Sequence, residues 1–344
     1  MHGRPRNTPG HAPLAVTMGE PAGIGGEILL KAWTARNAAT PVFFAIDNPD
    51  RLRALAARFG LNCPIVPITA TSDANAAFSQ GLPVLPLQVA IGEVALGKPR
   101  AETGKAVIAA IDQAVALVRD GGAAAMITNP IQKASLQAAG FAFPGHTEYL
   151  GHLAGATPVM MLAVEGLRVV PVTVHLPLRD VAAKLTTAAI VAHGRITAAA
   201  LQRDFGVPAP RLAVAALNPH AGESGTMGDE EIRIIAPAVT QLRADGIAVR
   251  GPLPADTLFH AAARTEYDAV ICMYHDQALI PLKTIDFAGG VNVTIGLPFV
   301  RCSPDHGTAL DIATRGIADP TSLIAALRMA REIADRRHAA TVTP

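Results

Sequence analysis

The sequence predicts an α/β fold built on mostly parallel sheets, from three observations. Short apolar runs rich in β-branched residues alternate with helix-like segments almost throughout the 344 residues. These runs carry few polar residues, which is typical of strands covered by helices on both faces. Aromatic residues make up only 4% of the chain and alanine is abundant, a composition that suits helices packed closely on a sheet. A chain of this length holds two domains or one large α/β domain.

Strands and helices are expected in regular succession in the first part of the chain. The expected strands are 14–17, 41–46, 63–68, 82–87 and 123–128, and the expected helices are 27–35, 50–59 and 103–120. The helix 103–120 has the clearest pattern, because Val107 and Ile111 belong to an apolar stripe at helical spacing. We expect Thr103 to cap its N-terminus and the Gly121-Gly122 pair to end it.

The same alternation continues in the second part. The expected strands are 159–164, 167–174, 212–217 and 269–274, and the expected helices are 187–205, 230–245 and 322–336. The Glu165-Gly166 pair between the first two of these strands predicts a hairpin, the one antiparallel feature we expect. No low-complexity linker separates the elements, so any domains must share hinges.

The composition limits the classes of partner and the compartment. The net charge of +1 gives no general attraction to nucleic acid or to a membrane surface. Cys63, Cys272 and Cys302 share no CxxC spacing, which fits a reduced, cytoplasmic protein. The basic, proline-bearing residues 1–13 are expected to form a disordered tail. Residues 19–21 interrupt the apolar run that follows, so we expect neither an export signal nor a membrane span.

Three histidines each stand just past the end of an apolar run: His175 follows 169–174, His220 follows 212–219 and His275 follows 269–274. Ligands of a parallel sheet bind outside the carboxyl ends of the strands, so these histidines can converge on one point. Three imidazoles with an open fourth position form a catalytic metal site. Any one of them alone would be interpreted as a structural or surface residue, but the repeated placement predicts a metal-dependent enzyme.

Two turns offer donors to an anion. The turn 19–26 holds four glycines, which let backbone amides approach an anion, but tight turns also need glycine for steric reasons. The usual nucleotide-binding fingerprints are absent from it. His146 and Thr147 follow a Pro-Gly turn and can donate to a carboxylate or a phosphate, although Thr147 alternatively serves as a helix cap.

Further polar residues follow the apolar runs of the second half. Lys283 and Arg301 can clamp a phosphate, the arginine in bidentate fashion. Asp256 or Asp276 can hold a metal-bound water or orient an imidazole. Asn292 adds an amide near these residues. Each would be a solvated surface group if it stood alone.

The segment that begins at Asp305 resembles a loop of the decarboxylating β-hydroxyacid dehydrogenases, the relatives of isocitrate and isopropylmalate dehydrogenase. Its sequence DHGTALDIA (305–313) matches the H-G-[ST]-A-x-D-I-A pattern of that superfamily. In the superfamily this loop embraces the adenine end of NAD or NADP. The resemblance implies a cofactor site that contains Asp305, His306, Gly307, Thr308, Ala309 and Asp311.

Stretches spread over residues 19–313 resemble the 4-hydroxythreonine-4-phosphate dehydrogenase family of pyridoxal phosphate biosynthesis. They are GEPAGIG (19–25), PGHTEYL (144–150), TVHLPLRD (173–180), LNPHAGE (217–223), GPLPADTLF (251–259), MYHDQALIPLK (273–283), VNVTIGLPFVR (291–301) and DHGTALDIA (305–313). The chain departs from the family pattern at Gly26, where proline is usual, and at Asn129. Neither departure removes a functional side chain, but we expect Gly26 to loosen the first turn of its helix.

This resemblance implies a homodimer of isopropylmalate-dehydrogenase-like subunits with two α/β/α domains each and an active site in the interdomain cleft, completed by the partner subunit. The first domain would comprise 14–130 and 298–344 with the dinucleotide-binding loop, and the second 131–297 with the metal histidines and the dimer contacts. The implied metal ligands are His175, His220 and His275, and the implied substrate contacts are His146, Thr147, Lys283, Asn292 and Arg301. Lys283 and Asp256 are the candidates for the catalytic base, because the related dehydrogenases use a lysine–carboxylate pair.

The implied reaction is the NAD(P)-dependent oxidation of 4-phosphohydroxy-L-threonine to 2-amino-3-oxo-4-phosphooxybutanoate, which decarboxylates to 3-amino-2-oxopropyl phosphate. One divalent metal per site is implied; zinc, magnesium, manganese and cobalt remain open, as does the choice between NAD and NADP. The main alternative is a dehydrogenase of the same family that oxidises a sugar-acid phosphate or a dihydrodiol carboxylate. A zinc hydrolase and a solute-binding protein are weaker alternatives, because neither explains the DHGTALDIA loop together with the three histidines.

Overall fold

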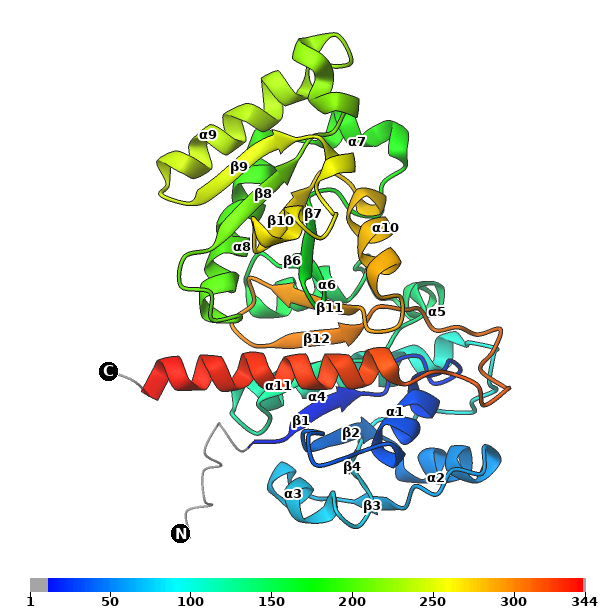
Figure 1. Cartoon of the computed structure of the whole chain (residues 1–344). Coiled ribbons are helices and arrows are strands. Elements are labelled where there is room, and N and C mark those ends of the chain that lie inside the picture. The colour runs from blue at the N-terminus through cyan, green and yellow to red at the C-terminus, as the bar shows by residue number, and fades with distance from the viewer. Residues whose placement is uncertain (1–11, 343–344) are drawn as a thin grey trace. The chain divides into compact units, whose positions relative to one another are not determined.

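The computed structural model describes residues 12–342 of the chain. Contacts between residues divide it into two compact units (Figure 1). Unit 1 comprises Met1–Ala156 and Leu297–Pro344, and unit 2 comprises Thr157–Gly296. The mostly parallel α/β fold that the sequence predicts is confirmed in both.

Unit 1 is built on a parallel sheet in which β1 lies between β2 and β5. The strand order is β3-β4-β2-β1-β5-β12. The strands are β1 (Leu14–Thr17), β2 (Phe43–Asp47), β3 (Ile65–Pro67), β4 (Leu82–Pro86), β5 (Ala125–Thr128) and β12 (Arg301–Pro304). Every residue of β1, β2, β5 and β12 is buried, as expected for strands that are covered on both faces.

Helices flank the sheet of unit 1 (Figure 1). They are α1 (Gly25–Thr34), α2 (Pro49–Arg58), α3 (Ala74–Ala77), α4 (Gly104–Arg119), α5 (Lys133–Ala138), α6 (His146–Ala154) and α11 (Thr321–Val342), with short 3₁₀ turns at Thr71–Asp73 and Ala101–Thr103. The apolar stripe of α4 is buried, but the prediction that Thr103 caps this helix is wrong. Its Oγ1 donates to the carbonyl of Arg100 instead, because Thr103 itself belongs to a 3₁₀ turn and has helical dihedral angles.

Unit 2 has a mixed sheet with the strand order β11-β6-β7-β10-β8-β9. The strands are β6 (Val159–Val164), β7 (Leu167–Pro171), β8 (Arg211–Ala215), β9 (Ala248–Leu253), β10 (Ala269–Cys272) and β11 (Val291–Ile295). The hairpin of β6 and β7 is confirmed. It is not the only antiparallel pair in the described chain, because β11 also runs antiparallel to β6, along which it forms a five-residue register.

The helices of unit 2 are α7 (Leu178–Lys184), α8 (Thr187–Arg203), α9 (Ala236–Ala244) and α10 (His275–Ile285). Shorter turns are η4 (Pro219–Gly225), η5 (Glu231–Ile235), η6 (Ala255–Thr257) and η7 (Ala263–Thr265). The helix expected at 230–245 begins with η5, a π-helical turn, before it becomes α-helical. Leu162, Val169 and Val270 belong to the hydrophobic core of this unit.

Two expectations about the organisation of the chain need correction. Residues 131–156 were expected in the second domain, but they belong to unit 1. The reason is a shared core, in which Phe141 and Tyr149 pack together and Tyr149 donates a hydrogen bond to Asp112 on α4. Of the expected N-terminal tail, residues 1–11 lie outside the described residues. Ala12 and Pro13 are buried and accept hydrogen bonds, so they belong to the folded unit.

Candidate active site

The three histidines follow three neighbouring parallel strands of unit 2. Strand β10 lies between β7 and β8 and runs parallel to both. His175, His275 and His220 follow β7, β10 and β8 respectively, so all three leave the same edge of the sheet.

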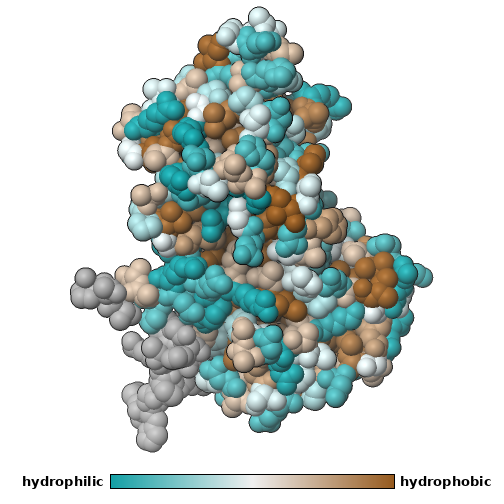
Figure 2. All heavy atoms as spheres, in the orientation of Figure 1, coloured by the Kyte–Doolittle hydropathy of each residue, from teal (hydrophilic) through white to brown (hydrophobic). Residues whose placement is uncertain are grey.

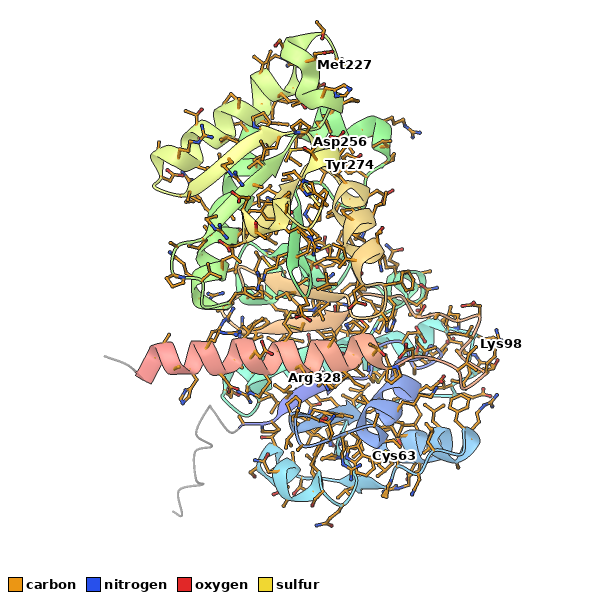
Figure 3. All side chains as sticks on the ribbon, in the orientation of Figure 1. Cys63, Lys98, Met227, Asp256, Tyr274 and Arg328 are labelled. Atoms are coloured by element: carbon orange, nitrogen blue, oxygen red, sulfur yellow. The ribbon has the colours of Figure 1, made fainter. Side chains whose placement is uncertain are left out.

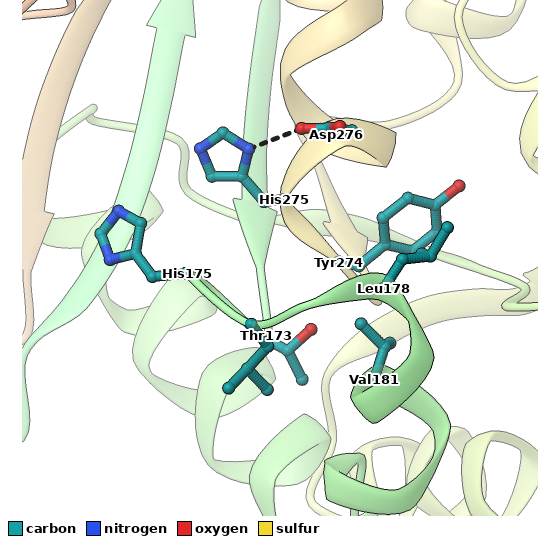
Figure 4. Close-up of a pocket in the computed structure, with 8 residues that line it drawn as sticks. Thr173, His175, Leu178, Val181, Tyr274, His275 and Asp276 are labelled. Carbon is teal, nitrogen blue, oxygen red and sulfur yellow. Dashed lines mark hydrogen bonds and ion pairs between the residues drawn. The ribbon is translucent and has the colours of Figure 1, made fainter.

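His175 and His275 line one pocket (Figure 4). Its volume is about 210 Å³, and Thr173, Tyr274 and Asp276 also line it. The centroids of the two imidazole rings are 6.0 Å apart. His275 Nδ1 lies 2.8 Å from Oδ1 of Asp276, so this carboxylate orients the ring.

The separation of the two rings can be compared with that of two imidazoles bound to one metal ion. An imidazole that binds a metal at about 2.0–2.1 Å has its ring centre about 3 Å from the ion, so two ligand rings lie no more than about 6–6.5 Å apart. Two imidazoles at the tetrahedral angle of a zinc site have ring centres about 5 Å apart, so the 6.0 Å between His175 and His275 requires a wider angle at a shared ion. With Nδ1 of His275 facing Asp276, its Nε2 is the nitrogen left for a metal.

His220 stands apart from this pair. It does not line the pocket of His175 and His275. Nowhere in residues 12–342 do three or more His, Cys, Asp or Glu side chains gather as a metal cluster would require. The assignment of His220 as a third ligand therefore stays a prediction.

The backbone around His220 has an unusual conformation. Residues 220–224 all have positive φ, from 44° at Glu223 to 76° at Gly222. His175 also has a positive φ of 55°. The left-handed conformation costs about 1–2 kcal/mol for a residue with a Cβ, so two of the three histidines lie in strained backbone. Such strain is concentrated at functional sites.

The anion-binding candidates Arg301, His146 and Thr147 belong to unit 1. Arg301 begins β12 and is 4% exposed, and it donates two hydrogen bonds to Oγ1 of Thr128 at the end of β5. Burial lowers the pKa of Arg301 to about 10, so it remains a cation at neutral pH. Thr128 is neutral and orients the guanidinium, while the charge of Glu148 favours the cationic form of Arg301.

His146 begins helix α6. Its Nε2 is buried and has no hydrogen-bond partner among the described residues. Burial and, second, the charge of Arg301 lower the pKa of His146 well below 6.5, so the ring is neutral. Gly145 occupies the cap position of α6, so the alternative role of Thr147 as a helix cap is wrong. A neutral imidazole beside a buried arginine can donate a hydrogen bond to a phosphate or a carboxylate.

The other three predicted residues belong to unit 2. Lys283 lies on α10 two turns beyond His275, and its Nζ is 5.1 Å from the ring centre of Phe287. Asn292 lies on β11, and its Oδ1 is buried without a hydrogen-bond partner in the described part of the chain. Asp256 is exposed in the turn η6, which contacts η4, the turn that holds His220 (Figure 3).

The predicted cofactor loop of unit 1 lies against the glycine-rich turn. Ile24 N donates to the carbonyl of Thr308 at 3.1 Å, and a Cβ on Gly23 would lie 2.8 Å from the same oxygen. This close approach supports the steric explanation for the glycine. The cofactor candidates Asp305, His306, Gly307, Thr308, Ala309 and Asp311 all lie in the irregular segment between β12 and α11. Ala309 has a positive φ of 43°.

Comparison with known proteins decides the family. The model of the family described as pyridoxal phosphate biosynthetic protein PdxA matches residues 37–330. The chain belongs to the PdxA family. A 4-hydroxythreonine-4-phosphate dehydrogenase of Caulobacter vibrioides is 51% identical over 332 residues, 94% of this chain and 98% of the relative.

Solved structures agree with membership of the PdxA family. The crystal structure of 4-hydroxythreonine-4-phosphate dehydrogenase from Klebsiella pneumoniae matches with a TM-score of 0.84 and 40% identity, over 94% of this chain and 98% of that one. A terephthalate 1,2-cis-dihydrodiol dehydrogenase from Burkholderia xenovorans matches with a TM-score of 0.61 and 27% identity, over 93% and 98% of the two chains.

The structure adds polar residues that the sequence had not singled out. Thr128 contacts Arg301. The sequence feature that could have identified it is its position at the carboxyl end of an apolar run, which is also the feature that indicated the histidines. Glu20 is 1% exposed and accepts hydrogen bonds from Ala22 N and Ser135 Oγ, and its burial raises its pKa. Glu231 lies inside an expected helix, where nothing in the sequence distinguishes it from a surface residue.

Proposed function

We propose that this PdxA-family protein oxidises 4-phosphohydroxy-L-threonine with NAD or NADP as the hydride acceptor. The product, 2-amino-3-oxo-4-phosphooxybutanoate, loses its carboxylate as carbon dioxide and gives 3-amino-2-oxopropyl phosphate. The observation that carries the proposal is the 51% identity to a 4-hydroxythreonine-4-phosphate dehydrogenase over 98% of that protein.

The three histidines would hold one divalent ion, zinc, magnesium or cobalt. A bound divalent ion polarises the substrate oxygens and lowers the pKa of the hydroxyl that is oxidised. The shared pocket of His175 and His275 and the contact of Asp276 with the ring of His275 support this role. His220, at the end of the adjacent strand, would complete the donor set.

Arg301, His146, Thr147 and Asn292 would bind and orient the substrate. The charge of Arg301 and the neutral imidazole of His146 suit the phosphate or the carboxylate. The unsatisfied Oδ1 of Asn292 suits an ammonium or hydroxyl donor. These residues hold the substrate in place and make no bonds to the reacting carbon.

Lys283 and Asp256 are the proposed proton acceptors. As the hydride leaves C3 for the nicotinamide, the hydroxyl proton passes to one of them and the carbonyl forms. The electron pair of the carboxylate bond then remains on the substrate as carbon dioxide departs, and the same groups return a proton. Lys283 can accept a proton only as a neutral amine, and once protonated it would contribute a cation for the phosphate.

The segment 305–311 would bind the adenine end of the dinucleotide. Its fixed position against the glycine-rich turn supports this role, because a loop that must enclose a cofactor needs an anchored base. Three free, buried cysteines support a reducing, cytoplasmic location. Among the described residues no helix is long and apolar enough to cross a membrane.

We further propose a homodimer whose partner subunit completes the site. Large apolar side chains are exposed in unit 2, on α7, on and just after α10, and in the turns near η4. They are Leu178, Met227, Ile232, Ile280 and Phe287. Figure 2 shows apolar residues exposed among hydrophilic ones on the visible face. Exposed large apolar side chains such as these are candidates for burial in an interface. Sedimentation velocity tests the dimer, and a monomer at micromolar concentration would contradict it.

NAD(P)H absorbance tests the activity. Metal-replete protein should form NADH or NADPH from 4-phosphohydroxy-L-threonine, a chelator should abolish this turnover, and added divalent metal should restore it. The second candidate is a dehydrogenase for a dihydrodiol carboxylate or a sugar-acid phosphate, favoured by the match to the terephthalate dihydrodiol dehydrogenase. Turnover of 4-phosphoerythronate or a dihydrodiol in place of the amino acid phosphate would establish it. A lack of turnover with every substrate would contradict both.

A further inference from the structure

A buried carboxylate holds the segment that follows strand β8, just before His220. Glu231 is 3% exposed, and its Oε1 accepts from the backbone N–H groups of Leu217 and Asn218, both at 2.8 Å. Its Oε2 accepts from Asn218 Nδ2 at 2.9 Å. One side chain therefore fixes both the main chain and a side chain in the segment between β8 and His220.

Neighbouring residues close around this carboxylate. Asn218 Nδ2 also donates to Oε2 of Glu230 at 2.7 Å. A Cβ on Gly222 would lie 2.6 Å from Oε2 of Glu231, so only glycine fits there. The π-helical turn that begins at Glu231 widens the helix by one residue at this point, and such turns are frequent at functional sites.

We infer that Glu231 is the positioning residue for His220. By fixing Leu217 and Asn218, it sets where the left-handed turn 220–224 begins and therefore where the imidazole of His220 lies. The inference rests on the proposed function, because it assumes that His220 joins His175 and His275 on a metal. Asp276 orients His275 directly, whereas Glu231 acts through the main chain.

Cobalt binding tests this role without an activity assay. The full chain is stripped with a chelator and titrated with Co²⁺ alone, and affinity and the visible absorption band are recorded for the wild type and for His220→Ala. Glu231→Gln, in which an amide NH₂ replaces one acceptor oxygen, should bind Co²⁺ about 10–100-fold more weakly. Its absorption band should shift towards that of His220→Ala.

Glu223→Gln is the matched control. Glu223 lies in the left-handed turn of His220 with an exposed side chain, so the substitution removes one negative charge without removing a hydrogen bond to Leu217 or Asn218. It should bind Co²⁺ within about twofold of the wild type. An equal loss of Co²⁺ affinity in Glu223→Gln would show that the charge of the loop, and not the hydrogen bonds of Glu231, controls metal binding. That result would overturn the inference.

A variant in which the side-chain hydrogen-bond donor and acceptors exchange places should restore Co²⁺ binding. In the triple variant Asn218→Asp, Glu230→Gln and Glu231→Gln, both glutamines can donate to the new carboxylate, and Oε1 of the residue at 231 still accepts from the main chain. Recovery of Co²⁺ affinity supports the hydrogen-bond arrangement. Should Glu231→Gln lack a cooperative unfolding transition, Gly222→Ala displaces the same carboxylate sterically and should weaken Co²⁺ binding as much.

Two outcomes separate failure of the inference from failure of the proposed function. If wild type and His220→Ala bind Co²⁺ with the same affinity and band, the three-histidine site itself is wrong. If they differ while Glu231→Gln and Gly222→Ala behave as wild type, the site stands and Glu231 has no positioning role.

Discussion

The guanidinium of Arg301 donates twice to a single hydroxyl, with Nε 3.1 Å and one terminal nitrogen 2.6 Å from Oγ1 of Thr128. Both side chains are buried, and they come from the neighbouring parallel strands β12 and β5. A buried cation is thus oriented by the hydroxyl of a neutral side chain.

We expect Thr128→Val to cost about 1–3 kcal/mol of unfolding free energy, because it leaves buried charged donors without their acceptor. Thr128→Ser keeps the hydroxyl and should cost less. Urea unfolding measures the stability, and KM for the phosphorylated substrate should rise in the valine variant only. Equal KM values in the two variants would show that Thr128 does not hold Arg301 for anion binding.

His146 should make the stability of the fold sensitive to acid. Its folded-state pKa lies well below 6.5, because burial and then Arg301 disfavour the imidazolium. The unfolded chain binds a proton at this residue as the pH falls below about 6.5, whereas the folded chain does not. The free energy of unfolding therefore keeps the full contribution of His146 above pH 6.5 and loses it progressively below that pH.

His146→Gln removes this group, so we expect its stability to fall less than that of the wild type between pH 7.5 and pH 5. The difference cannot exceed about 2 kcal/mol at pH 5, since each pH unit contributes about 1.4 kcal/mol. Urea unfolding at the two pH values measures it. Equal losses of unfolding free energy in both proteins would show that a group other than His146 causes the acid sensitivity.

Asp276→Asn should weaken divalent metal binding about 10–100-fold, because the amide no longer favours the tautomer and orientation of His275 that expose Nε2. Calorimetry with Zn²⁺ on chelator-treated protein measures the affinity. Asp286→Asn, on an exposed carboxylate at the end of α10, is the control and should leave it unchanged.

Gly23→Ala should disturb the cofactor loop. The new Cβ would lie 2.8 Å from the carbonyl oxygen of Thr308, and a backbone atom cannot move away as a side-chain end can. We expect weaker NAD(P) binding and a loss of about 1–3 kcal/mol in stability, measured by calorimetry and thermal unfolding.

Gly26→Ala is the comparison, because its Cβ would meet only side-chain ends, Leu55 at 2.7 Å and the guanidinium of Arg51 at 3.3 Å. Alanine also suits the helical backbone of α1 better than glycine does. Its NAD(P) affinity should stay at the wild-type value. A loss as large as that of Gly23→Ala would show that the whole turn, and not the contact with Thr308, supports the cofactor.

Sequence patterns predicted much of the architecture because local physics determines it. The alternation of buried runs and helical stripes located β1, β5, β8 and β10 within a residue or a few, and the Glu165-Gly166 turn predicted the hairpin of β6 and β7. The pairing of β11 with β6 was missed, because they are separated by more than a hundred residues and nothing local records their contact.

By itself the sequence determined which residues end the strands, because burial of an apolar run places the polar residue that follows it at the edge of the sheet. That places His175, His220 and His275 at one edge, and the segment motifs indicated the family. Only the tertiary structure decided which of these residues meet. His175 and His275 share a pocket, whereas Thr128, Glu231 and the left-handed turn at His220 became visible through hydrogen bonds and dihedral angles that arise between distant segments. Such contacts depend on packing in three dimensions, which no local spacing encodes.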